Sequence, residues 1–171
     1  MNNIGVIGLS VMGLNLALNM ADKGYKVSIY NRTSSVVDEV MRDHGHENFT
    51  PTYNLENFVK SLERTRRVFL MIKSGKPIDM VIDQLIGLLD EGDIIIDGGN
   101  SYFKDTIRRS NYLEDKKINY LGVGISGGEE GARFGPAIMP SGNREAYEHV
   151  KDIFENISAK AYGEACCKYI S

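Results

Sequence analysis

The residues best suited to chemistry lie in a glycine-rich turn near the N-terminus, Gly8-Leu9-Ser10-Val11-Met12-Gly13. The turn follows an apolar run typical of a buried strand and precedes apolar residues at helical spacing. Gly8 permits a tight turn, Ser10 is small enough for the backbone to approach a pyrophosphate, and Gly13 allows close packing of helix and strand. The N-terminus of the helix adds free N–H groups and a partial positive charge. We therefore predict a dinucleotide site here, the alternative being a purely structural turn.

The residues that end the second expected strand, Tyr30-Asn31-Arg32-Thr33, indicate which dinucleotide is bound. An NAD site usually carries an acid here that accepts hydrogen bonds from the ribose 2′-hydroxyl, and this stretch has no acid. Arg32 can instead pair with a 2′-phosphate and stack on adenine, while Asn31 and Thr33 offer neutral donors. We predict NADP; the alternative is an exposed arginine that follows a strand.

Three later strand ends are rich in glycine and polar residues: Ile72-Lys73-Ser74-Gly75, residues 97–101 and residues 124–131. Ligands of parallel sheets lie beyond the carboxyl ends of the strands, and glycine leaves the backbone bare for close approach. Asn100 can donate and accept, and so can bridge cofactor and substrate. Ser126, with the amides of Gly127 and Gly128, can hold hydroxyls or a carboxylate. A plain surface loop is the alternative for this last segment.

The elements that must position these residues alternate between short β-rich runs and helical stretches. This pattern predicts an α/β fold with a doubly wound, mainly parallel sheet, a Rossmann-type dinucleotide-binding domain. We expect strands at residues 4–8, 27–30, 68–72, 94–96, 120–124 and 137–139. Helices are expected from Met12 to a cap at Gly24 and at 34–41, 55–62, 77–89, 105–115 and 145–157. An irregular connection is expected at 44–53, and a glycine-rich loop after the fifth strand.

The composition excludes several classes of protein. The chain has 171 residues, 42% of them hydrophobic, which suits one globular domain that needs no disulfide or metal to fold. A net charge of −3 gives no general attraction to nucleic acid or to an anionic membrane. The longest apolar runs have strand length, so no membrane span is expected. We interpret the location as cytoplasmic by default, and the basic groups Arg64, Arg66, Arg67, Arg108 and Arg109 as solvated.

Two other groups of residues are weaker candidates for a site. His44 and His46 flank Gly45, but no cysteine or acid cluster completes a ligand set, so no metal is predicted. Cys166 and Cys167 are adjacent, a spacing that rarely allows a relaxed disulfide, and ordinary packing is expected for both.

Over nearly its whole length the chain resembles the decarboxylating 6-phosphogluconate dehydrogenases. The matching stretches are residues 8–15, Asn31-Arg32-Thr33, residues 92–101 and residues 125–142. The run of residues 126–132, Ser-Gly-Gly-Glu-Glu-Gly-Ala, is specific to that family. The related β-hydroxyacid dehydrogenases share its serine and two glycines but continue differently. The chain departs from the family pattern by small changes at Ser10, Ser74 and Ser141.

The resemblance implies oxidation of the 3-hydroxyl of 6-phosphogluconate by NADP and loss of CO2 to give ribulose 5-phosphate. This reaction belongs to the pentose phosphate pathway and to gluconate utilisation. The resemblance assigns cofactor contacts to Gly8, Leu9, Ser10, Val11, Met12, Gly13, Asn31, Arg32, Thr33, Ile72, Lys73, Ser74 and Asn100. It assigns substrate contacts to Asn100, Ser126, Gly127 and Gly128.

In the family, the general base is a lysine and the general acid a glutamate, both in a segment beyond the last residue of this sequence. We therefore expect residues 1–171 to be a single NADP-binding domain without a catalytic residue. The helical catalytic domain, which also forms the homodimer, would lie outside the chain. Lys73 is not the family's catalytic lysine, and Glu129 and Glu130 are expected to order the loop. The alternatives are a stand-alone nucleotide-binding module and a related β-hydroxyacid dehydrogenase or imine reductase.

Overall fold

The computed structural model describes residues 1–170, which form a seven-stranded sheet and a small hairpin. The order of the sheet is β3-β2-β1-β4-β5-β6-β7, and its strands are parallel except for the antiparallel β7. The strands are β1 (Ile4–Ile7), β2 (Val27–Tyr30), β3 (Phe49–Pro51), β4 (Arg67–Leu70), β5 (Ile94–Asp97), β6 (Asn119–Ser126) and β7 (Ala137–Gly142). The predicted doubly wound α/β fold is therefore confirmed.

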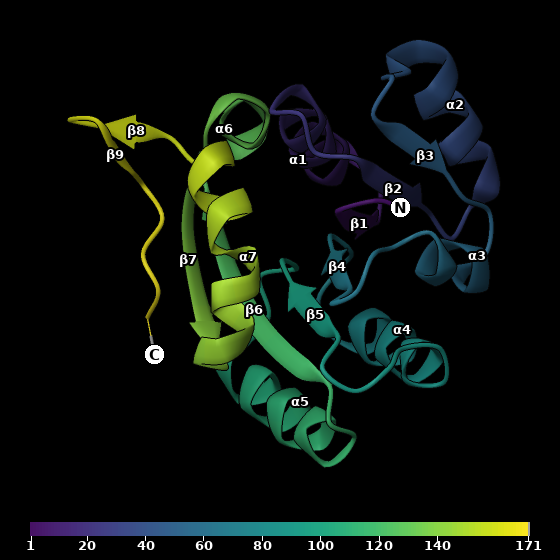
Figure 1. Ribbon diagram of the computed structural model, residues 1–171, viewed down its shortest axis with the longest axis vertical. Helices are drawn as coiled ribbons and strands as arrows, with labels where there is room; N and C mark the ends of the chain where they lie inside the picture. Colours follow the sequence, from purple (N-terminus) through teal and green to yellow (C-terminus); the bar gives the residue numbers. More distant parts are fainter. Residues whose placement is uncertain (171) are drawn as a thin grey trace.

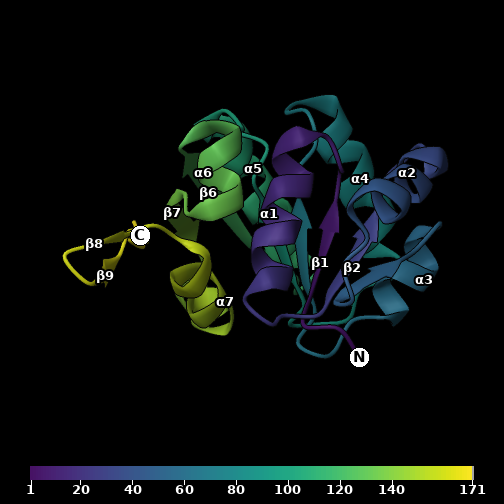
Figure 2. The ribbon, with the colours of Figure 1, turned by 90° about the horizontal axis from the view of Figure 1, so that it is seen from above.

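Helices cover both faces of the sheet (Figures 1 and 2). One face packs against α1 (Val11–Asp22), α2 (Ser34–His44) and α7 (Arg144–Ile157). The other face packs against α3 (Leu55–Lys60), α4 (Lys76–Ile86) and α5 (Phe103–Asp115). The short α6 (Gly128–Phe134) lies beside α1, and the hairpin of β8 (Lys160–Ala161) and β9 (Glu164–Ala165) projects at the edge (Figure 2). No helix in the described part of the chain is long and apolar enough to cross a membrane.

The central strands read as unbroken apolar runs because the sheet is covered on both sides. In β5, Ile94 and Ile96 belong to the core on the α1 side, whereas Ile95 belongs to the core on the α4 side. Neighbouring β4 alternates in the same way, with Phe69 on the first side and Val68 on the second. Side chains of these strands therefore pack into both cores, and this packing fixes the position of their carboxyl ends.

Two expected loops contain regular structure. In the connection expected to be irregular, β3 pairs with β2 at the edge of the sheet, where Pro51 is tolerated because it lacks only an outward N–H. In the glycine-rich segment after β6, α6 forms because Ala132, which is 1% exposed, packs against α1. Gly127 and Gly128 enter this helix at φ +131° and +65°, a region that glycine adopts without strain.

The prediction that the basic clusters are solvated is wrong for three of the five arginines. The side chains of Arg66, Arg67 and Arg109 are 12%, 18% and 2% exposed. Each has polar partners that offset much of the cost of its burial, although Arg66 Nε has no hydrogen-bond partner among the described residues. Arg66 bonds Asp93, Arg67 donates to backbone carbonyls, and Arg109 bonds carboxylates of α4 and β5. Arg64 and Arg108 are exposed, as predicted.

Candidate functional site

A hollow of about 680 Å³, called the inner hollow below, lies at the carboxyl ends of β1, β4 and β5. Ile125, near the end of β6, also borders it. The hollow lies where the sheet order reverses between β1 and β4, the place that ligands occupy in doubly wound sheets. Seven of the predicted cofactor residues line it: Gly8, Ser10, Met12, Asn31, Ile72, Lys73 and Asn100. The chain thus brings residues that follow four separate strands, β1, β2, β4 and β5, to one concave surface.

The glycine-rich turn is packed so tightly that two of its positions have no room for a side chain. A Cβ atom on Gly8, where φ is +101°, would lie 2.3 Å from the carbonyl oxygen of Met71. A Cβ atom on Gly13 would lie 1.9 Å from the carbonyl oxygen of Gly8. The absence of both side chains lets α1 begin directly against the ends of β1 and β4 at the rim of the hollow.

The N-terminus of α1 is built to receive an anion. Ser10 is its N-cap in an extended conformation, no side chain caps the helix, and its first turn holds no acid. The first N–H groups of a helix have no acceptor within the helix, and they carry the positive end of its dipole. Ser10 and Met12 line the hollow, so this end of α1 lies at its wall. A phosphate there would meet free donors and no opposing charge.

Asn31 has a role that sequence reasoning did not assign. Its Oδ1 accepts a hydrogen bond of 3.0 Å from the N–H of Leu9, and its Nδ2 donates to the carbonyl of Thr33. The side chain therefore ties the glycine-rich turn to the end of β2, beside the hollow. Leu9 is buried and turned into the core, so this residue contributes backbone rather than side chain.

A second hollow of about 320 Å³, called the outer hollow below, shares Asn31 and Ile72 with the inner hollow and continues beyond them. Its walls are mostly apolar, and Arg32 is exposed at its lining. In the described chain no acid lines this hollow: Ile7, Tyr30, Asn31, Arg32, Ile72, Pro77, Met80, Val81 and Gln84. Apolar walls beside an unopposed cation can accept an aromatic base with an anionic group.

The loop after β5 holds Asn100 in an unusual conformation. Asn100 has φ +58°. It lines both the inner hollow and a third hollow of about 280 Å³. On either side of it, Gly99 N–H donates to Asp97 at 2.9 Å and Ser101 Oγ donates to Asp97 at 2.6 Å. Tyr120 also donates to Asp97, and burial together with that carboxylate raises the pKa of Tyr120, which keeps its hydroxyl protonated. Sequence reasoning missed Asp97, although it directly precedes the Gly-Gly-Asn motif.

The predicted substrate residues lie at the end of β6. Ser126 is the last residue of the strand, Gly127 and Gly128 open α6, and all three are exposed. They do not line the inner hollow, although Ile125, the residue just before them, does. Of the predicted cofactor residues, five lie outside the linings of the two hollows: Leu9, Val11, Gly13, Thr33 and Ser74.

Two asparagines on α1 that the sequence analysis did not single out hold α6 in place. Asn15 Nδ2 donates to the carbonyl of Glu129 at 3.2 Å. Asn19 Nδ2 donates to the carbonyls of Ala132 and Ile157 at 3.1 and 2.9 Å. Polar residues four positions apart in an otherwise apolar helix were the available signal, because they share one face. The helix that follows the glycine-rich turn therefore also positions the segment of Ser126.

Comparison with known proteins identifies relatives of the chain. A family model described as the NAD binding domain of 6-phosphogluconate dehydrogenase matches residues 3–171. The decarboxylating 6-phosphogluconate dehydrogenase of Bacillus licheniformis is 54% identical over 99% of this chain and 36% of that protein. A Bacillus subtilis relative, named as NAD(+)-dependent and decarboxylating, is 53% identical over the same shares. The chain thus spans about a third of the length of these relatives.

Solved structures give the same result. The Plasmodium falciparum 6-phosphogluconate dehydrogenase, described in apo form, with NADP+ and with 6-phosphogluconate, superposes with a TM-score of 0.93. It is 40% identical and covers 98% of this chain and 36% of that one. The Mycobacterium tuberculosis 3-hydroxyisobutyrate dehydrogenase has a TM-score of 0.82 over 99% of this chain and 54% of its own, but at 18% identity it shows the fold alone. The chain belongs to the family of NAD-binding domains of 6-phosphogluconate dehydrogenase.

Proposed function

We propose that residues 1–171 are the NADP-binding domain of a decarboxylating 6-phosphogluconate dehydrogenase. The observation that carries this proposal is the pair of joined hollows. One contains the free N-terminus of α1, and the other contains Arg32 and no acid among its described lining residues. A 2′-phosphate adds about two negative charges to the ribose, and these need a cation rather than the carboxylate of an NAD site.

The residues present fit each part of this cofactor. The turn Gly8–Gly13 would hold the pyrophosphate, because the uncapped N-terminus of α1 offers free N–H groups beside the hollow that Gly8, Ser10 and Met12 line. Arg32, Asn31 and Thr33 would surround the phosphorylated ribose. The segment Ile72–Ser74 and Asn100 would face the nicotinamide, since Ile72, Lys73 and Asn100 line the inner hollow. Bound NADP accepts a hydride at its nicotinamide ring, and the chain's part is to bind and orient the cofactor.

We further propose that Asn100, Ser126, Gly127 and Gly128 contact 6-phosphogluconate. The Plasmodium relative is described in complex with that substrate. Asn100 lines the inner hollow, and Ser126, Gly127 and Gly128 come directly after Ile125, which also lines it. We propose the oxidation and decarboxylation of 6-phosphogluconate for a longer protein that carries this domain, because the chain spans only 36% of the length of the Bacillus licheniformis relative. We also propose that the catalytic acid and base, and the homodimer contact, lie outside residues 1–171. A cytoplasmic location is proposed with them.

Calorimetric titration of the chain with NADP and NAD tests the cofactor. This test matters because one relative is named as NAD(+)-dependent. We expect tighter binding of NADP, and we expect Arg32→Glu to weaken NADP about 10- to 100-fold, the usual effect of losing hydrogen bonds to a charged group. NAD should be little affected. Arg42→Glu is the matched control, because Arg42 is exposed on α2 and lines neither cofactor hollow.

Equal affinity for NADP and NAD, or no affinity for either, would contradict the cofactor proposal. A loss of both ligands in Arg32→Glu would remove Arg32 from the 2′-phosphate site. The substrate is tested with the product of the gene that encodes this domain, by following NADPH and CO2 formation from 6-phosphogluconate and from 3-hydroxyisobutyrate. Turnover of 3-hydroxyisobutyrate alone would contradict the proposed substrate but not the proposed cofactor site.

A further inference from the structure

Next to the loops that line the inner hollow lies a buried charged side chain that neither the proposed cofactor contacts nor the proposed substrate contacts explain. Arg109, on α5, is 2% exposed and is among the largest fully buried side chains of the described residues. Its neighbour Arg108 is 55% exposed at the surface. Burying a guanidinium is unfavourable unless its donors are satisfied, so the contacts of Arg109 indicate what it holds.

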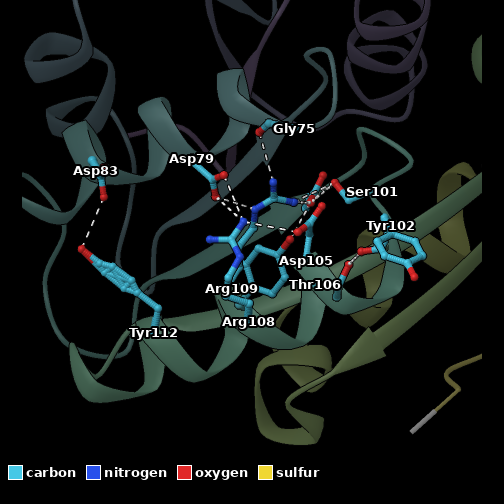
Figure 3. Close-up of polar contacts among 12 residues, drawn as sticks. Gly75, Asp79, Asp83, Ser101, Tyr102, Asp105, Thr106, Arg108, Arg109 and Tyr112 are labelled. Carbon is cyan, nitrogen blue, oxygen red and sulfur yellow. Dashed lines mark hydrogen bonds and ion pairs between the residues drawn. The ribbon is translucent and has the colours of Figure 1, made fainter.

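The guanidinium of Arg109 joins segments that are far apart in the chain (Figure 3). Nε donates to Asp79 Oδ1 on α4 at 2.8 Å, and Nη2 donates to the carbonyl of Gly75 at 3.1 Å. Nη1 donates to Ser101 Oγ at 3.0 Å and lies 3.4 Å from Asp97 Oδ2. One planar group thus connects α4 and the loop after β4 with the loop after β5.

Both loops that Arg109 bonds lead directly into the inner hollow. Gly75 ends the segment that contributes Ile72 and Lys73 to the lining, and Ser101 follows Asn100. Asn100 occupies the left-handed region at φ +58°, which asparagine adopts more readily than most other residues with a side chain. The bond from Arg109 to Ser101 fixes the residue next to Asn100, and the bond to Gly75 fixes the end of the segment that contains Ile72 and Lys73.

We propose that Arg109 is a positioning residue that holds the loops after β4 and β5 in the geometry that receives the nicotinamide half of the cofactor. This inference rests on the proposed function of the inner hollow. Arginine suits the task because its five donors lie in one rigid plane and reach several acceptors at once. A lysine offers one nitrogen and cannot reproduce the four contacts.

The four contacts of Arg109, with Asp79, Gly75, Ser101 and Asp97, are called the brace below. The charges around Arg109 keep these contacts intact over a wide pH range. Asp79 and Asp97 face it from α4 and β5, Tyr120 faces Asp97 from β6, and Arg108 shares Asp79 from the surface. The hydrogen bond from Arg109 lowers the pKa of Asp79, so that carboxylate stays ionised at neutral pH. The brace is therefore a constant part of the site rather than a switch.

Two ligands separate a positioning role from a merely structural one. Adenosine 2′,5′-bisphosphate has the adenosine half of NADP, so its base and 2′-phosphate would occupy the outer hollow and its 5′-phosphate would lie at the N-terminus of α1. Only NADP would extend further, to Lys73 and Asn100 on the loops after β4 and β5. For Arg109→Met we expect the Kd of NADP to rise about tenfold, because one or two loop residues must then be ordered on binding. The Kd of adenosine 2′,5′-bisphosphate should stay unchanged. Arg109→Lys should restore NADP binding only in part.

Two further variants complete the experiment. Arg108→Met is the matched control, since it removes the neighbouring arginine on α5 that shares Asp79, and it should change neither affinity. Ser101→Ala removes one contact of the brace and should give the same selective loss of NADP on a smaller scale, even if Arg109→Met does not fold. Equal weakening of both ligands, or of neither, would overturn the proposal. If the unaltered chain binds neither ligand, the proposed function itself fails.

Discussion

Replacing Gly13 by alanine tests the packing that lets α1 begin against the sheet. The added Cβ would lie 1.9 Å from the carbonyl oxygen of Gly8 and 3.1 Å from Met71 Cβ. Ordinary contact begins near 3.4 Å, so helix and turn must separate by about 1.5 Å. Overpacking of this kind costs about 1–3 kcal/mol, and contact with backbone rather than a flexible side chain places Gly13→Ala near 3 kcal/mol.

Urea unfolding followed by circular dichroism measures this cost. A loss of about 3 kcal/mol corresponds to about 6–12 °C in Tm for a domain of this length. The same shift moves the first turn of α1, so NADP affinity should fall as well. Gly87→Ala is the matched control, because Gly87 has φ −72° and its nearest neighbour would be 3.9 Å from the new Cβ. We expect it to be neutral or slightly stabilising.

The reasoning would be refuted if Gly13→Ala unfolded within about 0.5 kcal/mol of Gly87→Ala, the usual range of a surface change. Retained stability with lost NADP binding would show that the turn moves at little cost. The close contact at Gly13 would then matter for the site but not for the fold.

Two other perturbations test buried polar contacts. Asn19→Leu removes the donor that serves the carbonyls of Ala132 and Ile157, and should lower the free energy of unfolding by about 1–3 kcal/mol in urea titrations; unchanged stability would contradict that role. Asp79→Asn tests the acid limb of stability. The hydrogen bond from Arg109 holds the folded pKa of Asp79 below its ordinary 3.8, so its stabilisation is present above that value and is lost as pH falls through the lowered pKa. Tm measured against pH should therefore fall less steeply in acid for Asp79→Asn; an unchanged slope would contradict the pairing.

The alternation of strands and helices could be read from the sequence because its signals are local. A buried parallel strand needs apolar residues throughout, as in Ile94-Ile95-Ile96, and a phosphate-binding turn needs glycine at fixed spacing. The glycine-rich turn, Asn31, Ile72, Lys73 and Asn100 were predicted in this way, and the structure places them around joined hollows. Strand ends meet at one edge of a parallel sheet, so the element order alone indicates which segments are neighbours.

Elements with weak local signals were decided by tertiary contacts. The three-residue β3 contains a proline, and it forms because β2 offers an edge to pair with. The glycines of α6 oppose a helix, and it forms because Ala132 packs on α1 while Asn15 and Asn19 bond its carbonyls.

The arginines show most clearly what only the fold could decide. Arg108 and Arg109 are adjacent and chemically identical, yet one is exposed and the other buried. The acceptors of Arg109 come from residues 8 to 34 positions away in the chain. Sequence therefore determined the fold class and the glycine-rich turn, which depend on local periodicity and backbone freedom. Tertiary structure decided which charge is buried and which loops it holds, because the burial of a charge depends on partners that only folding brings together.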